Sequence, residues 1–104
     1  MIIAAALSEN NLNSPVDVHF SRCNWFGIYN SITKNLDFIV NPGISMDEDA
    51  GLKSAEILVS HSVNVAVAGR FSAKVVELFR KANVQMVIPE TNTSFLEFIN
   101  LIKK

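Results

Sequence analysis

The stretch Val63-Asn64-Val65-Ala66-Val67-Ala68-Gly69-Arg70 decides the fold of this chain. It is apolar up to Gly69 apart from Asn64, and a short continuous run of this kind is typical of a strand buried on both faces. Helical patterns lie before and after it. Because a helical crossover joins parallel strands with right-handed geometry, the second half of the chain is predicted to contribute parallel strands to one sheet.

Spacing and capping residues predict the helices around this strand. Apolar residues recur at helical intervals on both sides of it: Leu52, Ala55, Leu58 and Val59 before it, then Val75, Val76, Phe79 and Ala82 after it. Asp47-Glu48-Asp49 suits the positive end of the first helix, and Ser72 is a candidate N-cap for the second. A strand over 84–88 follows. Ser94 and Glu97 then have the spacing of a capping box that opens the last helix.

The first half of the chain predicts a central strand and a hairpin. The apolar run 2–7 indicates a strand buried on both faces, while 25–30 and 36–40 are strand-like and are separated by turn residues. One strand of the hairpin must be antiparallel to the rest. We therefore predict one domain over residues 1–104, of the three-layer α/β/α class, with a mixed five-stranded sheet that has one antiparallel strand.

This topology predicts where a ligand would bind. If the first strand is central, the hairpin extends the sheet to one side and the helical crossovers extend it to the other. Open α/β sheets bind ligands at such a switch point, beyond the carboxyl ends of the strands. The segments 7–22 and 69–72 are expected to line that crevice.

The chemistry of the chain is concentrated in the first of these segments. The stretch His19-Phe20-Ser21-Arg22-Cys23 holds an imidazole, a guanidinium and the single thiol of the sequence. Neutral imidazole binds transition metals, and a guanidinium can hold an anion. His19 is therefore a candidate ligand or else a loop side chain bonded to a carbonyl, and Arg22 and Arg70 are anion contacts or surface charges.

Cys23 has two interpretations. It is either a thiolate ligand beside His19 or a small buried side chain, which is the usual state of a free cysteine. Because clusters and zinc sites normally recruit several thiolates, one cysteine argues against a closed metal site within the chain. Any cluster would be loosely held, open or shared. For His61, near the end of the first helix, capping of that helix end is the expected role.

Composition excludes several classes of function. The net charge is −1 and the pI is about 6.1, which argues against nucleic acid as a partner. Residues 1–7 are apolar but lack a basic region and are too few to span a bilayer, so neither a signal peptide nor a membrane span is expected. A single cysteine fits a reducing, cytoplasmic location.

The order of several short motifs resembles a known family. Pro15-Val16, His19-Phe20-x-Arg22-x-x-x-Phe26, Asn41-Pro42, Ala50-Gly51 and Val65-x-Val67-x-Gly69-Arg70 together resemble the dinitrogenase iron–molybdenum cofactor biosynthesis family over the whole chain. That family includes NifX-like and NafY-like cofactor carriers. The resemblance implies a ribonuclease H-like fold and non-covalent binding of an iron–sulfur or iron–molybdenum type cluster, with His19 as ligand and Arg22 beside it.

The chain departs from the family pattern at four places. Ser21 and Ser72 stand where the family usually has glycine, and Glu48-Asp49-Ala50-Gly51 replaces a His-Gly-Ala-Gly motif. Cys23 stands where a small residue such as alanine is usual. These departures leave two hypotheses. The chain is a small cluster carrier that uses His19, Arg22, Cys23 and Arg70, or it is a protein-interaction module that kept the fold and lost the cluster.

We do not expect an enzyme. A nuclease on this fold needs carboxylates at the strand ends to hold two metal ions, and residues 2–7 carry none. Under the carrier hypothesis the partners are the cluster and a donor or acceptor protein. The chain would then be a monomer or a weak homo-oligomer.

Overall fold

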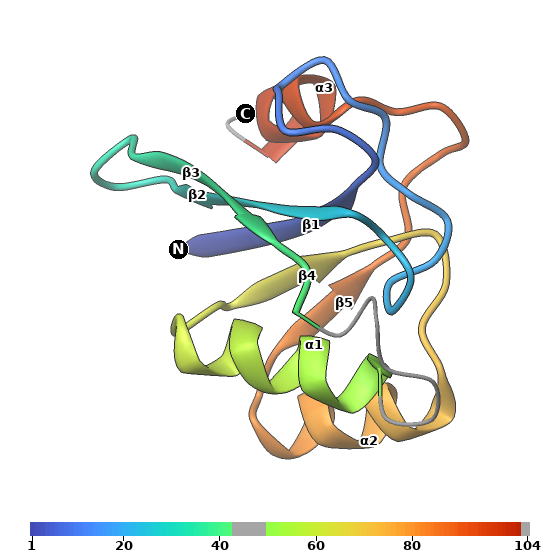
Figure 1. Ribbon diagram of the computed structural model, residues 1–104. Helices are drawn as coiled ribbons and strands as arrows, with labels where there is room; N and C mark the ends of the chain where they lie inside the picture. Colours follow the sequence, from blue (N-terminus) through green and yellow to red (C-terminus); the bar gives the residue numbers. More distant parts are fainter. Residues whose placement is uncertain (43–49, 103–104) are drawn as a thin grey trace.

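A mixed five-stranded sheet, with strand order β3-β2-β1-β4-β5, forms the centre of the molecule (Figure 1). The computed structural model describes residues 1–42 and 50–102. Along the chain the elements are β1 (Ile2–Leu7), β2 (Trp25–Asn30), β3 (Leu36–Val40), α1 (Ala50–Ser60), β4 (Val65–Val67), α2 (Ala73–Lys81), β5 (Gln85–Val87) and α3 (Phe95–Ile102).

The predicted topology is confirmed. β1 is the central strand, and it pairs antiparallel with β2 and parallel with β4. β2 also pairs antiparallel with β3, and β4 pairs parallel with β5, so β2 is the one strand that runs against the others. β4 and β5 are shorter than the predicted 63–68 and 84–88. The flanking Val63 and Ala68 are buried, as their apolar character suggests, but they lie outside the strand ladder.

Helices cover both faces of the sheet, which gives three layers (Figure 1). On one face, Ala4 and Ala6 of β1 belong to a core cluster with Leu58 of α1 and Phe79 of α2. The other face of β1, with Leu7, belongs to a second cluster that includes residues of α3. Because successive strand residues point to opposite faces, a strand between two helical layers must be apolar throughout.

The capping residues act as predicted. Ser72 is the N-cap of α2 and its side chain accepts a hydrogen bond from the Val75 N–H. At the start of α3 the Ser94 Oγ accepts from the Glu97 N–H at 3.1 Å, and the Glu97 carboxylate accepts from the Ser94 N–H at 3.2 Å. His61 lies 2.9 Å through Nδ1 from the Ile57 carbonyl at the end of α1, as its capping role requires.

Two apolar residues expected on buried helix faces are exposed instead: Ala82, and Ile102, which has the helical spacing of an apolar face with Phe95, Phe98 and Ile99. Ala82 follows the last residue of α2 and is its C-cap, so it no longer lies on the buried stripe. Ile102 ends α3 and is 40% exposed. The acidic residues 47–49, predicted to open α1, lie outside the described residues. No helix in the described part of the chain is long and apolar enough to cross a membrane.

Candidate functional site

Two loops lie side by side at the carboxyl ends of β1 and β4, as the topology predicts. The Gly69 N–H donates to the Asp17 carbonyl at 3.0 Å, and the Phe20 N–H donates to the Arg70 carbonyl at 3.3 Å. His19 and Arg70 form an isolated parallel bridge between the two loops. The imidazole and guanidinium expected at the switch point therefore come from segments that are paired through their backbones.

Gly69 permits this close approach. A Cβ atom built on Gly69 would lie 2.7 Å from the Cα of Val18 and 3.1 Å from its carbonyl oxygen. Both of those atoms are backbone, so no side chain can move aside to relieve the clash. The lack of a side chain at Gly69 is what lets the loop after β4 contact the loop after β1.

A small pocket of about 220 Å³ opens beside this pairing. It is lined by His19, Phe20, Ser21, Arg70, Phe71 and Ser72, and we call it the His19 pocket. Phe20 is buried, with ring centroids 5.2 to 5.4 Å from those of Phe26, Phe71 and Phe79. Phe20 and Phe71 of this aromatic cluster line the pocket. His19 and Arg70, which also line it, are exposed to solvent.

The first turns of two helices meet at this pocket. A Cβ atom built on Gly51, in the first turn of α1, would lie 3.4 Å from the Cβ of Ser21 and 3.6 Å from the Oγ of Ser72. Ser72 is in turn the N-cap of α2. Helix N-termini carry partial positive charge, and no described residue that lines the pocket is acidic. Arg70 and the N-terminus of α2 therefore make the described lining of the His19 pocket positive, while the acidic residues 47–49 that precede α1 lie outside the described residues.

Cys23 lies next to the pocket but faces the core. It is fully buried, and its Sγ donates a hydrogen bond to the Phe20 carbonyl at 3.3 Å. Burial, with a smaller contribution from the charge of Asp17, raises the pKa of the thiol to about 12. A metal-binding thiolate must lose its proton, so this environment favours the interpretation of Cys23 as a small buried side chain.

Arg22 takes a different place from the other predicted residues. It is exposed on the same loop but does not line the His19 pocket. Of the predicted site residues, the structure thus brings His19 and Arg70 together, buries Cys23 and leaves Arg22 outside the pocket.

Asn41 is a positioning residue whose role the sequence does not predict. It is fully buried, and its Nδ2 donates to the carbonyls of Ser21 at 3.1 Å and Cys23 at 2.9 Å. Its Oδ1 accepts from the Ser54 hydroxyl of α1 at 2.6 Å. In the sequence, Asn41 stands out only as part of the Asn41-Pro42 motif, and nothing local indicates what its side chain contacts. Its amide in fact ties the loop that carries the site to α1.

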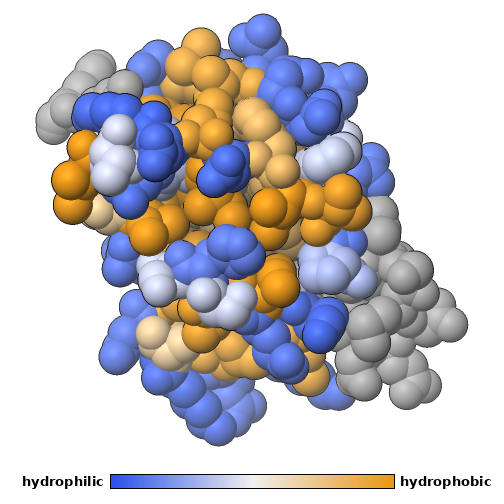
Figure 2. All heavy atoms as spheres, turned by 60° about the vertical axis from the view of Figure 1, so that its left-hand side comes forward, coloured by the Kyte–Doolittle hydropathy of each residue, from blue (hydrophilic) through white to orange (hydrophobic). Residues whose placement is uncertain are grey.

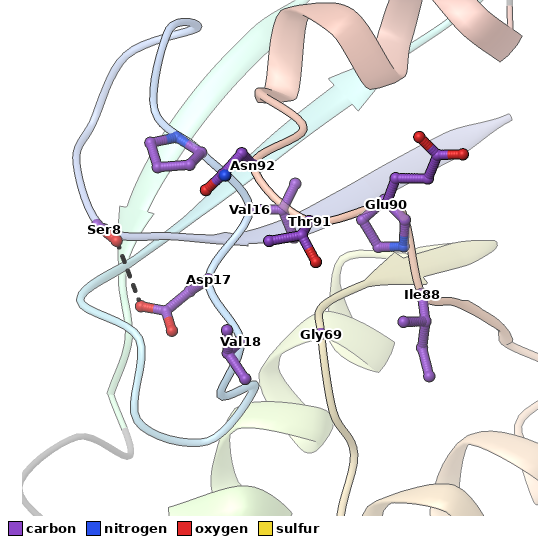
Figure 3. A pocket seen from close by; sticks show the side chains of 11 residues that line it. Ser8, Val16, Asp17, Val18, Gly69, Ile88, Glu90, Thr91 and Asn92 are labelled. Atoms are coloured by element: carbon purple, nitrogen blue, oxygen red, sulfur yellow. Dashed lines mark hydrogen bonds between the residues drawn. The ribbon is translucent and has the colours of Figure 1, made fainter.

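A second, larger pocket of about 410 Å³ lies on the other side of the paired loops (Figure 3). The loop after β1 forms one wall with residues 15–18, and residues 88–92 after β5 form the other. Figure 3 shows Val18 and Ile88 on either side of Gly69. The predicted crevice, 7–22 and 69–72, did not include residues 88–92, although β5 runs parallel to β4 and its carboxyl end must lie at the same edge.

The two pockets differ in charge. The larger pocket includes Asp17 and Glu90 among its lining residues and no described basic residue. Asp17 is held by its own loop, because its carboxylate accepts from the His19 N–H at 3.0 Å and the Ser8 hydroxyl at 3.4 Å. An anionic ligand is therefore expected in the smaller His19 pocket rather than in the larger one.

The described residues supply few ligands for a metal ion. Within 1–42 and 50–102, no three histidine, cysteine or acidic side chains are placed together so that they could hold a metal ion. His19 is the one candidate ligand on the described surface of its pocket. The donor set of the described residues does not suit a closed metal centre.

The chain matches one protein family by sequence and several solved proteins by structure. The sequence profile described as dinitrogenase iron-molybdenum cofactor matches residues 1–104. The apo form of the orange protein from Desulfovibrio gigas has a similar structure, with a TM-score of 0.91 and 17% identity over 98% of this chain and 86% of that chain. A putative NifB protein from Thermotoga has a TM-score of 0.84 and 24% identity over the same shares. No curated protein sequence matches.

Proposed function

This chain belongs to the dinitrogenase iron–molybdenum cofactor family, and we propose that it is a small non-enzymatic carrier of an anionic metal cluster. The cargo would be an iron–sulfur or iron–molybdenum type cluster or its precursor. It would sit in the His19 pocket and pass between a donor and an acceptor protein in the reducing cytoplasm.

The meeting of His19 and Arg70 beside the N-terminus of α2 carries the proposal. The imidazole supplies one ligand to a metal at the edge of the cluster, and the guanidinium of Arg70 contacts its negative charge. Ser21 and Ser72 place hydroxyl groups on the same pocket. Arg22, exposed on the same loop, would meet a cluster that extends beyond the pocket.

A single ligand suits transport of a cluster. A cluster held by several thiolates is difficult to release, whereas one imidazole together with hydrogen bonds gives a weaker hold. Cys23 contributes to the core in this proposal and is not a ligand. The nearby Asp17 carboxylate accepts from the His19 backbone N–H and the Ser8 hydroxyl, so in this proposal it holds the shape of the loop.

The test is uptake of a cluster by matched variants. The protein is incubated without oxygen with iron and sulfide, with and without molybdate, and metal per chain and visible absorption are measured after desalting. We expect His19→Ala to lose the chromophore and Arg70→Gln to retain less of it. The controls are His61→Ala and Arg80→Gln, which remove the same groups from exposed positions away from the pocket.

The outcomes separate the two functional hypotheses. Retention by wild type and both controls, with loss in His19→Ala, supports the carrier. If no form retains metal, the chain is better described as an interaction module that has lost its cluster. Ser21 and Ser72, which occupy pocket positions where the family usually has glycine, would then be the first residues to revert to glycine.

A further inference from the structure

The larger pocket takes no part in binding the proposed cluster, and it combines negative charge with space for a ligand. Asp17 and Glu90 line it, and no lysine or arginine within residues 1–42 and 50–102 does. No described lysine or arginine forms an ion pair with either carboxylate. Its volume of about 410 Å³ lies within the usual range of ligand pockets. The charge of the described lining therefore favours a cationic ligand.

The side walls of this pocket are aliphatic. Val18 is 56% exposed and Ile88 is 65% exposed, and both line the pocket. Figure 3 shows them on either side of Gly69, which has no side chain to fill the space between them. An aliphatic chain laid between Val18 and Ile88 would remove apolar surface of both from water. The ligand is therefore expected to carry its charge at the end of an apolar stem.

The hydrogen bonds of Asp17 indicate which cation fits. Its Oδ1 accepts from the His19 N–H at 3.0 Å, and its Oδ2 accepts from the Ser8 hydroxyl at 3.4 Å. Neither donor is a charged group, so neither neutralises the carboxylate. A guanidinium pairs best with two free carboxylate oxygens, whereas an ammonium group needs contact with only one. Because both oxygens of Asp17 already accept a hydrogen bond, the arrangement favours lysine over arginine.

We propose that the larger pocket binds a lysine side chain presented by a partner protein. The ammonium group would contact the Asp17 carboxylate, and Glu90 on the facing wall would add negative charge. The methylene stem would lie between Val18 and Ile88. Since these two side chains are more than half exposed, residues that flank the lysine can cover their outer surfaces, which a free amine would leave in water.

Asp17 also connects this pocket with the His19 pocket. The carboxylate that would meet the ammonium group accepts from the His19 N–H, and the Asp17 carbonyl accepts from the Gly69 N–H at 3.0 Å. A partner bound here would therefore lie directly beside the proposed cargo. That this partner is the donor or acceptor of the cluster rests on the proposed function, whereas the binding of lysine does not.

Titration of the metal-free protein with blocked tripeptides, followed by amide chemical shifts, tests the proposal. The probes are acetyl-Val-Lys-Val-amide and the same peptide with norleucine or arginine in the middle. We expect the lysine peptide to shift the amides of residues 16–19 and 88–92, with half-saturation at roughly 1–20 mM and weaker binding at high salt. The norleucine peptide keeps the stem without the charge, and it should bind at least roughly fivefold more weakly.

Two variants with matched controls locate the binding. Asp17→Asn keeps an oxygen for the His19 N–H but removes the charge, so it should weaken binding of the lysine peptide at least roughly fivefold. Asp37→Asn removes a charge from an exposed position on β3, at the other edge of the sheet from β5, and should have no effect. Ile88→Ser removes one apolar wall from the surface and should weaken binding about threefold.

The control for Ile88→Ser is Ile32→Ser. Ile32 is 80% exposed in the hairpin turn, on the side of the molecule that Figure 2 brings forward. Figure 2 shows a broad hydrophobic area on that side, where nonspecific apolar binding of the peptide would occur. Specific binding at the larger pocket is expected to be unchanged in Ile32→Ser.

Several results would overturn the proposal. They are an absence of shifts at the pocket, equal binding of the norleucine or arginine peptide, and unchanged binding in Asp17→Asn. Putrescine that binds as tightly as the lysine peptide would assign the pocket to a free amine and not to a partner protein. Because every titration is made without metal, its outcome is independent of whether the protein retains a cluster.

Discussion

Single residues decide whether the site loop keeps its shape, and Asn41 is the clearest case. Its amide group bonds to two carbonyls of the loop and to a hydroxyl of α1, all of them buried or partly buried. Each of those groups would be left without this partner if the amide were removed. The buried side chain of Asn41 thus positions the loop that carries His19, the proposed ligand.

Asn41→Ala is expected to destabilise the protein by about 2–3 kcal/mol, since it leaves buried carbonyl groups unsatisfied. Urea unfolding followed by circular dichroism measures the loss. Asn10→Ala, at an exposed position, is the control and should change stability by less than about 0.5 kcal/mol. Equal stability of the two variants would show that the Asn41 bonds are replaced by water.

The raised pKa of the buried Cys23 thiol leads us to expect a loss of stability at alkaline pH. Its pKa is about 12 in the folded chain against 9.0 for an unperturbed thiol, so the folded state holds the proton more tightly than the unfolded state. The resulting stabilisation is complete below pH 9 and falls as the pH rises towards 12. The free energy of unfolding should decline less steeply in Cys23→Ala than in wild type over this range. Identical slopes in the two proteins would refute the burial effect.

Helix ends are the features of single elements that the sequence predicts best. The Ser94–Glu97 box at the start of α3 satisfies two backbone N–H groups that the helix itself cannot bond. Ser94→Ala should lower the free energy of unfolding by about 1 kcal/mol. Glu97→Ala should lower it by about the same amount or slightly less. Thermal unfolding of both single variants and of the double variant measures their coupling. Strictly additive losses would mean that the two bonds form independently.

The packing of α3 on the hairpin depends on Gly27 of β2. A Cβ atom at Gly27 would lie 2.8 Å from the Cδ1 of Leu7 and 2.8 Å from the Cδ2 of Phe95. Gly27→Ala is therefore expected to destabilise the protein by about 1–3 kcal/mol through overpacking. In the Phe95→Leu background the same change should cost less, because the ring that obstructs the Cβ is gone. If Gly27→Ala destabilises the Phe95→Leu protein as much as it destabilises wild type, the clash with the Phe95 ring is not the cause of the destabilisation.

At the scale of the whole molecule, the site depends on the approach of two loops far apart in sequence. Gly69→Ala would push the loop after β4 away from Val18 and separate Arg70 from His19. We expect loss of stability together with at least roughly tenfold weaker cluster retention. Amide shifts of residues 17–20 and 69–72 report the separation. Gly51→Ala offers no clean control, since its Cβ would also meet Val75.

The sequence predicts all eight elements and their order, and it places the crevice correctly. Periodicity and capping are local properties, so the bounds of β1, β2 and β3 could be predicted to the residue. The contribution of residues 88–92 and the role of Asn41 could not. Both depend on which segments meet in space, and the local pattern around Pro89 or Pro42 indicates only that a strand ends there.

The sequence by itself determined the topology, because buried strands joined by helical crossovers leave few arrangements of the sheet. It also determined which residues are candidates for the site. Only the tertiary structure decided among those candidates. Backbone pairing across Gly69 brings His19 and Arg70 to one pocket, whereas the turn that follows Phe20 carries the Cys23 thiol into the core and leaves Arg22 exposed. The direction in which each side chain points depends on packing between distant segments, and no local pattern encodes it.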